Sequence, residues 1–394
     1  MRVSIPRSVN DYIALLIMMF TISTLFQGII PFSLNRIIIT AILILVFFYD
    51  LRNPTKHTLF LLLYLVILAF LNVMLTQETS LALKDLIYFG TTLCLLDYLK
   101  EKTALDKLKN SFEKYKKIFK VIFYIVYGIT VLSVFSSANY SYAWGESNYF
   151  IGLARDTHVM ASSTCLLMAF MLFLFFKEKF SYVRLGMFVM LLFIVFQTGA
   201  RTYIVSATII LYAYIQGNIN GTLKKTILLG IAVTAVVIIF LRSGMYQKFI
   251  WSSIASNQGT TDSLVSSTGG RSAFWLIDIK EFVQNNPIYQ LIGHGFDYVY
   301  QVNYEHYHMH IWAHNDIIDL LLSVGLIGTI YYLREWVSFF IMSFAQNKNK
   351  RLLVAMCVYI AFPMFFNGLF TVQHYFMSVI IMTITLRGYK NEQY

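Results

Sequence analysis

The chain has 394 residues, a mean hydropathy of +0.63 and a formal net charge of +11. Hydrophobic residues make up 58% of it and charged residues only 13%. A soluble globular chain is nearer half apolar and a quarter charged, so the composition excludes a soluble protein.

Apolar runs recur along the whole sequence, each long enough to cross a hydrocarbon core of about 30 Å. We therefore expect an all-α polytopic membrane protein with about 12 transmembrane helices. Residues 1–241 should hold the first nine, 242–313 a large outer loop with short amphipathic helices, and 314–394 the last three. The expected spans are 12–30, 35–49, 58–75, 80–98, 117–137, 158–176, 182–198, 201–216, 225–241, 315–340, 352–370 and 372–387.

The basic residues divide unevenly between the two sides that these spans define. The side of the termini carries 22 of the 31 Lys and Arg residues, and the other side carries seven. By the positive-inside rule both termini are cytoplasmic. The net charge therefore reflects topology, and no nucleic-acid partner is indicated. On the cytoplasmic side, "LKEKTALDKLKNSFEKYKKIFK" (99–120) is typical of an amphipathic helix on the anionic inner leaflet.

Two outer segments are longer than the other loops. They are residues 136–158 and 242–313, and loops of such length are usually functional or disordered. "SAFWLIDIKEFV" (272–283) has apolar positions at helical spacing and follows turn-forming glycines, which predicts a short helix at the membrane surface. The polar stretch 256–270 should be mobile.

Three outer arginines lie near the ends of spans. Arg201, in "FQTGARTYIVSA", is confined to the outer interface by apolar segments on both sides. Charges at that depth are costly and usually functional, although the side chain could also snorkel to the headgroups. Arg271 follows two glycines at a predicted helix start, a position that favours anions. Arg155 has Asp156 beside it as a simple partner.

Five of the eight histidines crowd into residues 294–314. The spacing of His306, His308, His310 and His314 resembles a metal-binding tract, but no acidic residue or cysteine completes a ligand set. His314 stands apart because "HND" predicts a helix N-terminus, with Asn315 or Asp316 as its cap. A neutral imidazole on such a rigid element can serve as a general base.

Cations, a large loop and a base on the outer face together predict an anionic substrate taken from the outer leaflet. An enzyme there has no nucleoside triphosphate and needs an activated substrate, which a lipid-linked diphosphate sugar provides. Arginines would neutralise the departing diphosphate, and the base would deprotonate the acceptor hydroxyl. Nearby arginines should also lower the pKa of the histidine.

"QTGARTYIVS", "GGRSAFW", "NNPIYQLIGHG" and "AHNDIIDLLLSVGLIG", in this order, resemble the O-antigen ligase and O-antigen (Wzy-type) polymerase superfamily, and "FIGLARDTHVMAS" resembles its looser motif. Ala200 stands where some members have serine. The resemblance implies a GT-C-like membrane glycosyltransferase without metal or other cofactor, in the bacterial cytoplasmic membrane. It assigns catalysis to Arg201, Arg271 and His314. The substrate-binding residues would be Arg155, His158, Trp275, Asn315 and Asp316.

The implied substrates are an undecaprenyl-diphosphate-linked glycan donor and acceptor, polymerised into O-antigen or capsule. A chain-length regulator, a flippase and membrane lipid are the expected partners. The alternative is a ligase, which transfers the same donor glycan to lipid A core. A flippase for the lipid-linked glycan is a third possibility, for which Lys84, Asp85, Arg334 and Glu335 are the charged residues within spans.

Overall fold

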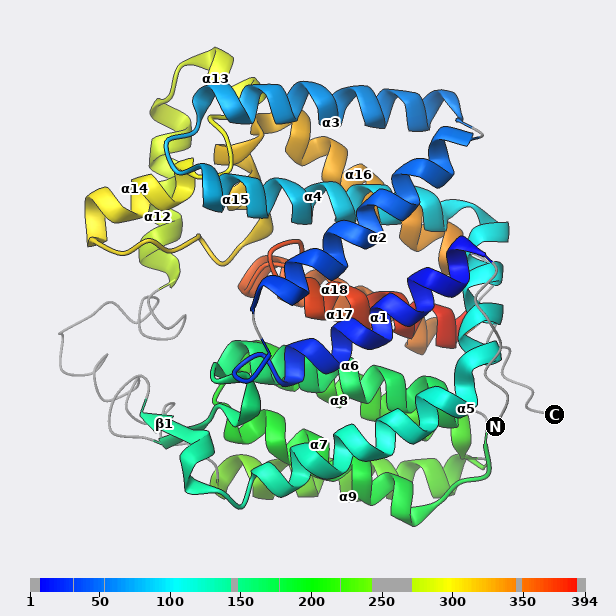
Figure 1. Cartoon of the computed structure of the whole chain (residues 1–394). Coiled ribbons are helices and arrows are strands. Elements are labelled where there is room, and N and C mark those ends of the chain that lie inside the picture. Colours follow the sequence, from blue (N-terminus) through cyan, green and yellow to red (C-terminus); the bar gives the residue numbers. More distant parts are fainter. Residues whose placement is uncertain are drawn as a thin grey trace.

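The computed structural model describes residues 8–30, 32–52, 54–142, 148–176, 178–219, 221–242, 271–344 and 349–387. These residues form a helical bundle with sixteen α-helices (Figure 1). The predicted mobile stretch 256–270 and residues 243–255 of the predicted outer loop lie outside the described residues. The long helices are α1 (Val9–Leu25), α2 (Phe32–Arg52), α3 (Lys56–Leu75), α4 (Thr79–Lys100), α5 (Lys102–Ser133), α6 (Thr157–Phe175), α7 (Tyr182–Gln197), α8 (Arg201–Asn218), α9 (Thr222–Arg242), α16 (Gly325–Phe344), α17 (Lys350–Phe366) and α18 (Gln373–Leu386).

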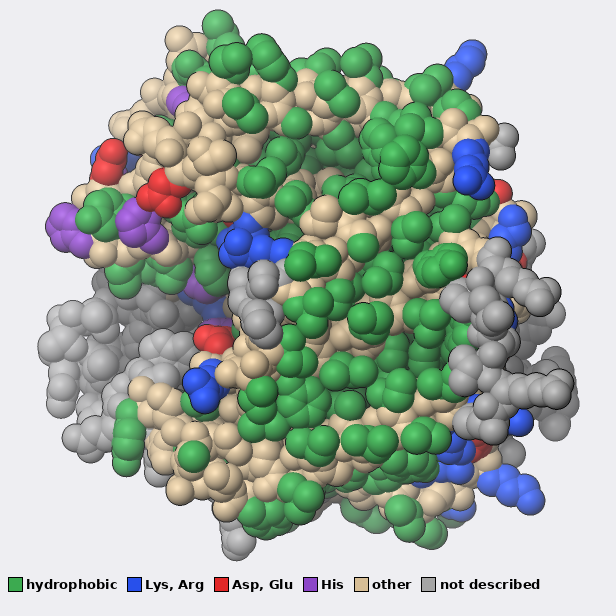
Figure 2. All heavy atoms as spheres, in the orientation of Figure 1, with side chains coloured by type: hydrophobic (Ala, Val, Ile, Leu, Met, Phe, Trp, Pro, Cys, Tyr) green, Lys and Arg blue, Asp and Glu red, His purple; other side chains and the backbone are tan. Residues whose placement is uncertain are grey.

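Four of these helices, α2, α3, α4 and α6, are long and apolar enough to cross a membrane. The shorter α1, α7 and α18 are also apolar. Large hydrophobic side chains stand exposed along α3, including Leu63, Phe70 and Val73. Figure 2 shows hydrophobic side chains over the middle of the molecule and most Lys and Arg at the end where α1 begins. The all-α membrane class is thus supported, since an exposed apolar surface of this kind needs lipid rather than water against it.

The centre of the bundle is formed by α6 and α18. Nearly every residue of both helices is buried. Several hydroxyl groups inside this core bond to the helix backbone, as in the bond from Thr164 to the Met160 carbonyl at 2.7 Å. Asp156 starts α6 by accepting a hydrogen bond from the Val159 amide at 2.8 Å, which satisfies one of the free donors of the first turn.

The predicted span 315–340 is broken into α15 (Asp316–Ser323) and α16. Gly325, at the break, has φ +66°, and a Cβ there would lie 2.4 Å from the backbone of Leu291. Gly293 has φ +78°, and a Cβ on it would meet the Ser323 carbonyl. The two glycine turns therefore pack directly on each other, and the amides of His294 and Gly295 bond to the free carbonyls of Leu322 and Ser323 at the end of α15, each at 2.9 Å.

The amphipathic segment 99–120 and the next predicted span form the single helix α5. Figure 1 shows the first part of α5 crossing the ends of the other helices before the chain turns to run alongside them. The apolar stripe of the first part, with Leu105, Leu108 and Phe112, is buried in the core. Its polar side reaches α1, where Lys114 pairs with Asp11 at 2.6 Å.

One end of the bundle carries additional elements, and we call it the site end. It holds the short helices α12 (Arg271–Gln284), α13 (Pro287–Ile292) and α14 (Tyr298–Tyr307). A small antiparallel hairpin of β1 (Tyr140–Tyr142) and β2 (Asn148–Phe150) lies there too, flanked by 3-10 turns at Ser137–Asn139 and Gly152–Ala154. Asp297 joins α14 to the α3–α4 turn by accepting hydrogen bonds from the amides of Gln77 and Glu78 at 2.7 and 2.8 Å.

Candidate functional site

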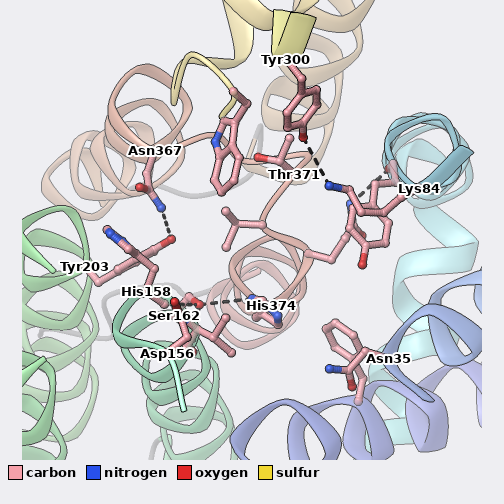
Figure 3. Close-up of a pocket in the computed structure, with 16 residues that line it drawn as sticks. Asn35, Lys84, Asp156, His158, Ser162, Tyr203, Tyr300, Asn367, Thr371 and His374 are labelled. Carbon is pink, nitrogen blue, oxygen red and sulfur yellow. Dashed lines mark hydrogen bonds between the residues drawn. The ribbon is translucent and has the colours of Figure 1, made fainter. Parts of the chain in front are cut away.

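A cavity of about 260 Å³ opens at the site end, among α1, α2, α4, α6, α8, α14 and the turn between α17 and α18 (Figure 3). Its wall includes His158 and Ser162 from α6, Tyr203 from α8 and Lys84 from α4. The elements that form it are far apart in the sequence, yet each contributes a residue near the same end of the bundle. A concave site with a few convergent polar groups is the usual form of a ligand site.

His314 lies next to this wall, on the short segment that leads into α15. The segment is fixed at three points. The Trp275 indole N–H donates to the Ala313 carbonyl at 2.7 Å, and the Ala313 amide donates to Asp319 at 2.8 Å. Asn315 caps α15 by accepting from the Ile317 amide at 3.0 Å. His314 itself has φ +56°, a left-handed conformation that persists only where the surroundings impose it.

The imidazole of His314 is buried and has few polar partners. It is 8% exposed, and its ring packs against the ring of Trp312, a residue of the cavity wall, with the two centroids 4.4 Å apart. The ring of His158, also in the wall, is 6.4 Å away. Among the described residues, no group hydrogen bonds to His314 Nδ1. Burial, then the charge of Arg271 and then that of His158 hold the pKa of His314 well below its usual value of 6.5. The ring is therefore neutral near pH 7 and can accept a proton.

Arg271, the first residue of α12, extends toward the turn after α17. Its guanidinium donates to the Phe366 carbonyl and, at 3.1 Å, to Asn367 Oδ1. The Asn367 amide in turn donates to the Tyr203 hydroxyl in the cavity wall. Both acceptors of Arg271 are neutral, and it joins no ion pair within the part of the chain that the structure describes. Its positive charge is thus left available for an anion.

Arg201 begins α8 immediately after the turn at Gly199, which has φ +69°. Burial lowers the pKa of Arg271, and the charge of Arg201 lowers it further, which places the two guanidinium groups in each other's field. Two neighbouring arginines remain protonated at any physiological pH. Together they create a positive potential beside a neutral imidazole.

The structure thus brings Arg201, Arg271, His158 and His314 together from α8, α12, α6 and the segment before α15. Trp275 and Asn315 hold the His314 segment in place, as described above. Asp316 is fully buried and accepts from the Tyr332 hydroxyl at 2.6 Å and the Leu369 amide at 2.7 Å. It therefore fixes the turn that carries Asn367.

Arg155 is placed apart from these residues. It is exposed, has φ +57°, and its side chain lies over Gly28 in the turn after α1. No ion pair joins it to Asp156 among the described residues, because Asp156 caps α6 instead. Arg155 is not among the residues that line the cavity.

The other loop histidines do not gather around a common point. His306, His308 and His310 are exposed; His310 stacks on Tyr304 with ring centroids 4.2 Å apart. His294 stacks between two tyrosines of α13 and α14.

Three side chains that could ligate a metal ion lie together where α3 begins and α4 ends. His57, Asp97 and Glu335 have donor atoms within 4.8 Å of one another. The Lys100 ammonium contacts both carboxylates there, so a cation already balances them.

Sequence reasoning missed several residues of the cavity wall. The sequence indicates Lys84 only as a charged residue within a span, next to Asp85; the structure shows that it pairs with Asp85 at 3.1 Å, lines the cavity and donates to Tyr300. Tyr203, Asn367, Ser162 and His374 are polar residues near the ends of predicted spans. That position was the available signal, and it is a weak one.

No protein-family model matches the chain. It matches no curated protein and no solved structure either.

Proposed function

We propose that the protein is a membrane glycosyltransferase that polymerises polyprenyl-diphosphate-linked glycan units into a surface polysaccharide. The observation that carries the proposal is the neutral, rigidly held imidazole of His314 beside Arg271, whose charge meets only neutral oxygens. The motif order that resembles the O-antigen polymerases supports the same chemistry. Lipid-linked donor and acceptor, both of undecaprenyl type, would enter from the outer leaflet of the bacterial cytoplasmic membrane.

The proposed topology has twelve spans, with both termini in the cytoplasm. Figure 1 shows α1 beginning and α18 ending at the same end of the bundle, opposite the site end. The excess of basic residues on the terminal side supports a cytoplasmic location for that end. The cavity would then face the outer side, where a flippase delivers the substrate and a chain-length regulator could act on the product.

In the proposed reaction an acceptor hydroxyl oxygen attacks the anomeric carbon of the donor sugar. The bond from that carbon to the diphosphate oxygen breaks, and the polyprenyl diphosphate leaves with the electron pair. Arg271 and Arg201 stabilise the negative charge that develops on the leaving group. The hydroxyl proton passes to His314, whose neutral form is favoured by burial and by Arg271. No step needs a cofactor.

The test is an in vitro reaction of the purified protein with a synthetic undecaprenyl-diphosphate repeat unit in EDTA, resolved on a gel. We expect a ladder of products with the wild type and none with His314→Ala. His310→Ala is the matched control, because His310 is exposed on the same segment and should leave the ladder intact. Transfer only after lipid A core is added would indicate a ligase. No transfer to either acceptor would refute the proposal.

A further inference from the structure

One part of the cavity wall differs in chemistry from the cluster of Arg201 and Arg271 near the cavity. It is formed by the turn after α17 and the start of α18, where Thr371, Gln373 and His374 line the cavity. We call these three residues the acceptor-atom wall. Figure 3 shows Thr371 and His374 on it, with Lys84 on one side of the cavity and Asn367 on the other.

The hydrogen bonds of Ser162 define the tautomer of His374. The Ser162 hydroxyl lies 2.8 Å from the His158 carbonyl and 3.2 Å from His374 Nδ1. A hydroxyl has one proton, and the carbonyl is the nearer acceptor, so Ser162 accepts from His374 Nδ1–H. His374 Nε2 is then unprotonated and can only accept. Stacking on Phe20, with centroids 5.7 Å apart and the rings 12° from parallel, fixes the ring plane.

Gln373 presents a second acceptor. Its amide nitrogen is surrounded by three oxygens, the Phe370 carbonyl at 2.7 Å and the Tyr88 carbonyl and Thr92 hydroxyl at 3.1 Å each. Because these three oxygens accept from the amide nitrogen, the other terminal atom of the Gln373 side chain is the oxygen Oε1. Gln373 is 1% exposed, and no described residue hydrogen bonds to its Oε1. A buried acceptor without a donor is costly unless a ligand supplies one.

Thr371 adds a hydroxyl, which also makes no hydrogen bond among the described residues. The wall therefore lacks charge and offers mainly acceptor atoms, so it matches a neutral ligand rich in O–H donors. Trp312 and Phe20 also line the cavity, so apolar side chains lie beside these atoms. At about 260 Å³ the cavity is smaller than the roughly 300–1,000 Å³ of sites for drug-sized ligands. One sugar ring fits this combination better than a whole oligosaccharide.

We propose that the acceptor-atom wall is a sugar subsite, in which His374 Nε2 and Gln373 Oε1 accept hydrogen bonds from hydroxyls of a single ring of the lipid-linked glycan. Ser162 is its positioning residue, because it holds His374 in the tautomer that leaves Nε2 free. The subsite rests on the proposed function, since it takes the sugar of the same substrate whose diphosphate the arginines bind.

The test compares the binding of lipids with and without sugar to the full-length protein in nanodiscs, by native mass spectrometry. The probes are bare undecaprenyl diphosphate and undecaprenyl diphosphates that carry N-acetylglucosamine, N-acetylgalactosamine or galactose. We expect at least one sugar-bearing lipid to bind more tightly than the bare lipid. Equal affinity for all four would overturn the sugar subsite, whereas binding of none of them would instead overturn the proposed function.

The variant His374→Phe keeps the flat ring and removes both nitrogens. It should weaken binding of the preferred sugar lipid about five- to ten-fold, the value of one neutral hydrogen bond, and leave the bare lipid unchanged. His374→Gln, which can restore an acceptor near Nε2, should recover part of the loss, and Ser162→Ala should lose about two- to three-fold. His310→Phe is the matched control. If His374→Phe weakens the sugar lipid and the bare lipid equally, or weakens neither, the assignment is wrong. If that variant does not fold, the affinities of Ser162→Ala and His374→Gln for the sugar lipid and the bare lipid decide in the same way.

Discussion

Replacing Arg271 by lysine separates the charge of this residue from its shape. The guanidinium donates through two different nitrogens, one to the Phe366 carbonyl and one to Asn367 Oδ1. Lysine preserves the positive charge but offers a single compact ammonium, which cannot hold both oxygens and an anion in the same planar geometry. If Arg271 binds diphosphate, the substitution should therefore weaken binding even though the net charge is unchanged.

The size of the effect follows from the bonds that lysine cannot replace. A hydrogen bond to a charged group contributes about 1.5–3 kcal/mol. Loss of one such bond to the diphosphate corresponds to a roughly ten- to hundred-fold higher Kd, at about 1.4 kcal/mol per factor of ten. Loss of the bond to Asn367 would add to this, because Asn367 in turn positions the Tyr203 hydroxyl.

The assay is the Kd of bare undecaprenyl diphosphate for the protein in nanodiscs, with thermal unfolding as a check on folding. Lys280→Met is the control, since Lys280 is an exposed cation on the same helix and should have no effect beyond about two-fold. An unchanged Kd for a folded Arg271→Lys protein would refute the planar contact. A similar loss in the Lys280 control would mean that the effect is not specific to Arg271.

Three further outcomes are expected. Burial raises the pKa of Asp278, on α12, to about 7. The folded chain therefore keeps a proton that the unfolded chain releases near pH 3.8. As the pH rises between these two values, the free energy of unfolding should fall. Asp278→Asn should remove this pH dependence of the free energy of unfolding, which amounts to at most roughly 4 kcal/mol. If the melting temperature changes between about pH 5 and 8 by the same amount in the variant as in the wild type, the prediction is wrong. Because the pKa of His314 lies well below 6.5, the acid limb of a kcat/KM profile should fall well under that pH, and a limb at pH 6.5 would argue against His314 as the base. Trp275→Phe removes the bond to the Ala313 carbonyl and should lower kcat about ten-fold, the effect of roughly 1–3 kcal/mol, with little change in donor binding; equal loss of both would indicate general misfolding.

The approximate positions of most long helices could be predicted because the apolar runs that form them are visible in the sequence. Arg201, Arg271 and His314 could be singled out because each lies at the edge of an apolar run, where a polar side chain has few structural roles. That these three residues lie near one another could be predicted only from the alternating direction of the spans, because this alternation places the three positions at the same end of the bundle. The pKa of His314 is lowered by Arg271 as the residues alone predicted, although burial is the larger cause.

The break at Gly325 could not be predicted, since "SVGLIG" is as apolar as the helices around it. Only the packing of Gly293 against Ser323 explains why the helix stops there. The hairpin in residues 140–150 and the continuity of α5 were missed because both depend on tertiary contacts. His374 could not be singled out for a related reason: a histidine near the end of a span is a weak signal until Ser162 from α6 is seen beside it.

The distribution of buried charge favours a one-sided site over a transport path. Charged residues gather at both ends of the bundle, around Arg271 and Lys84 at one end and around Glu335 where α4 ends. A path for a glycan or a proton would need polar groups or space between these ends. The described core between them has α6 and α18 at its centre, and the later turns of both helices are closely packed and largely apolar.

Several hydroxyls in that part of the core bond back to their own helix. Ser378 donates to the Tyr375 carbonyl at 2.6 Å and Thr383 to the Val379 carbonyl at 2.8 Å. Such bonds satisfy these two hydroxyls locally. The bonds that join helices there, from the Tyr375 hydroxyl to Ser206 and between the hydroxyls of Tyr359 and Ser378, link only neutral groups of α8, α17 and α18. We therefore expect reconstituted protein to leave lipid-linked glycan in the leaflet where it was added, measured by its accessibility to a sugar-specific lectin outside the vesicles. Rapid exchange between leaflets, retained in Arg271→Lys and His314→Ala, would instead favour a flippase.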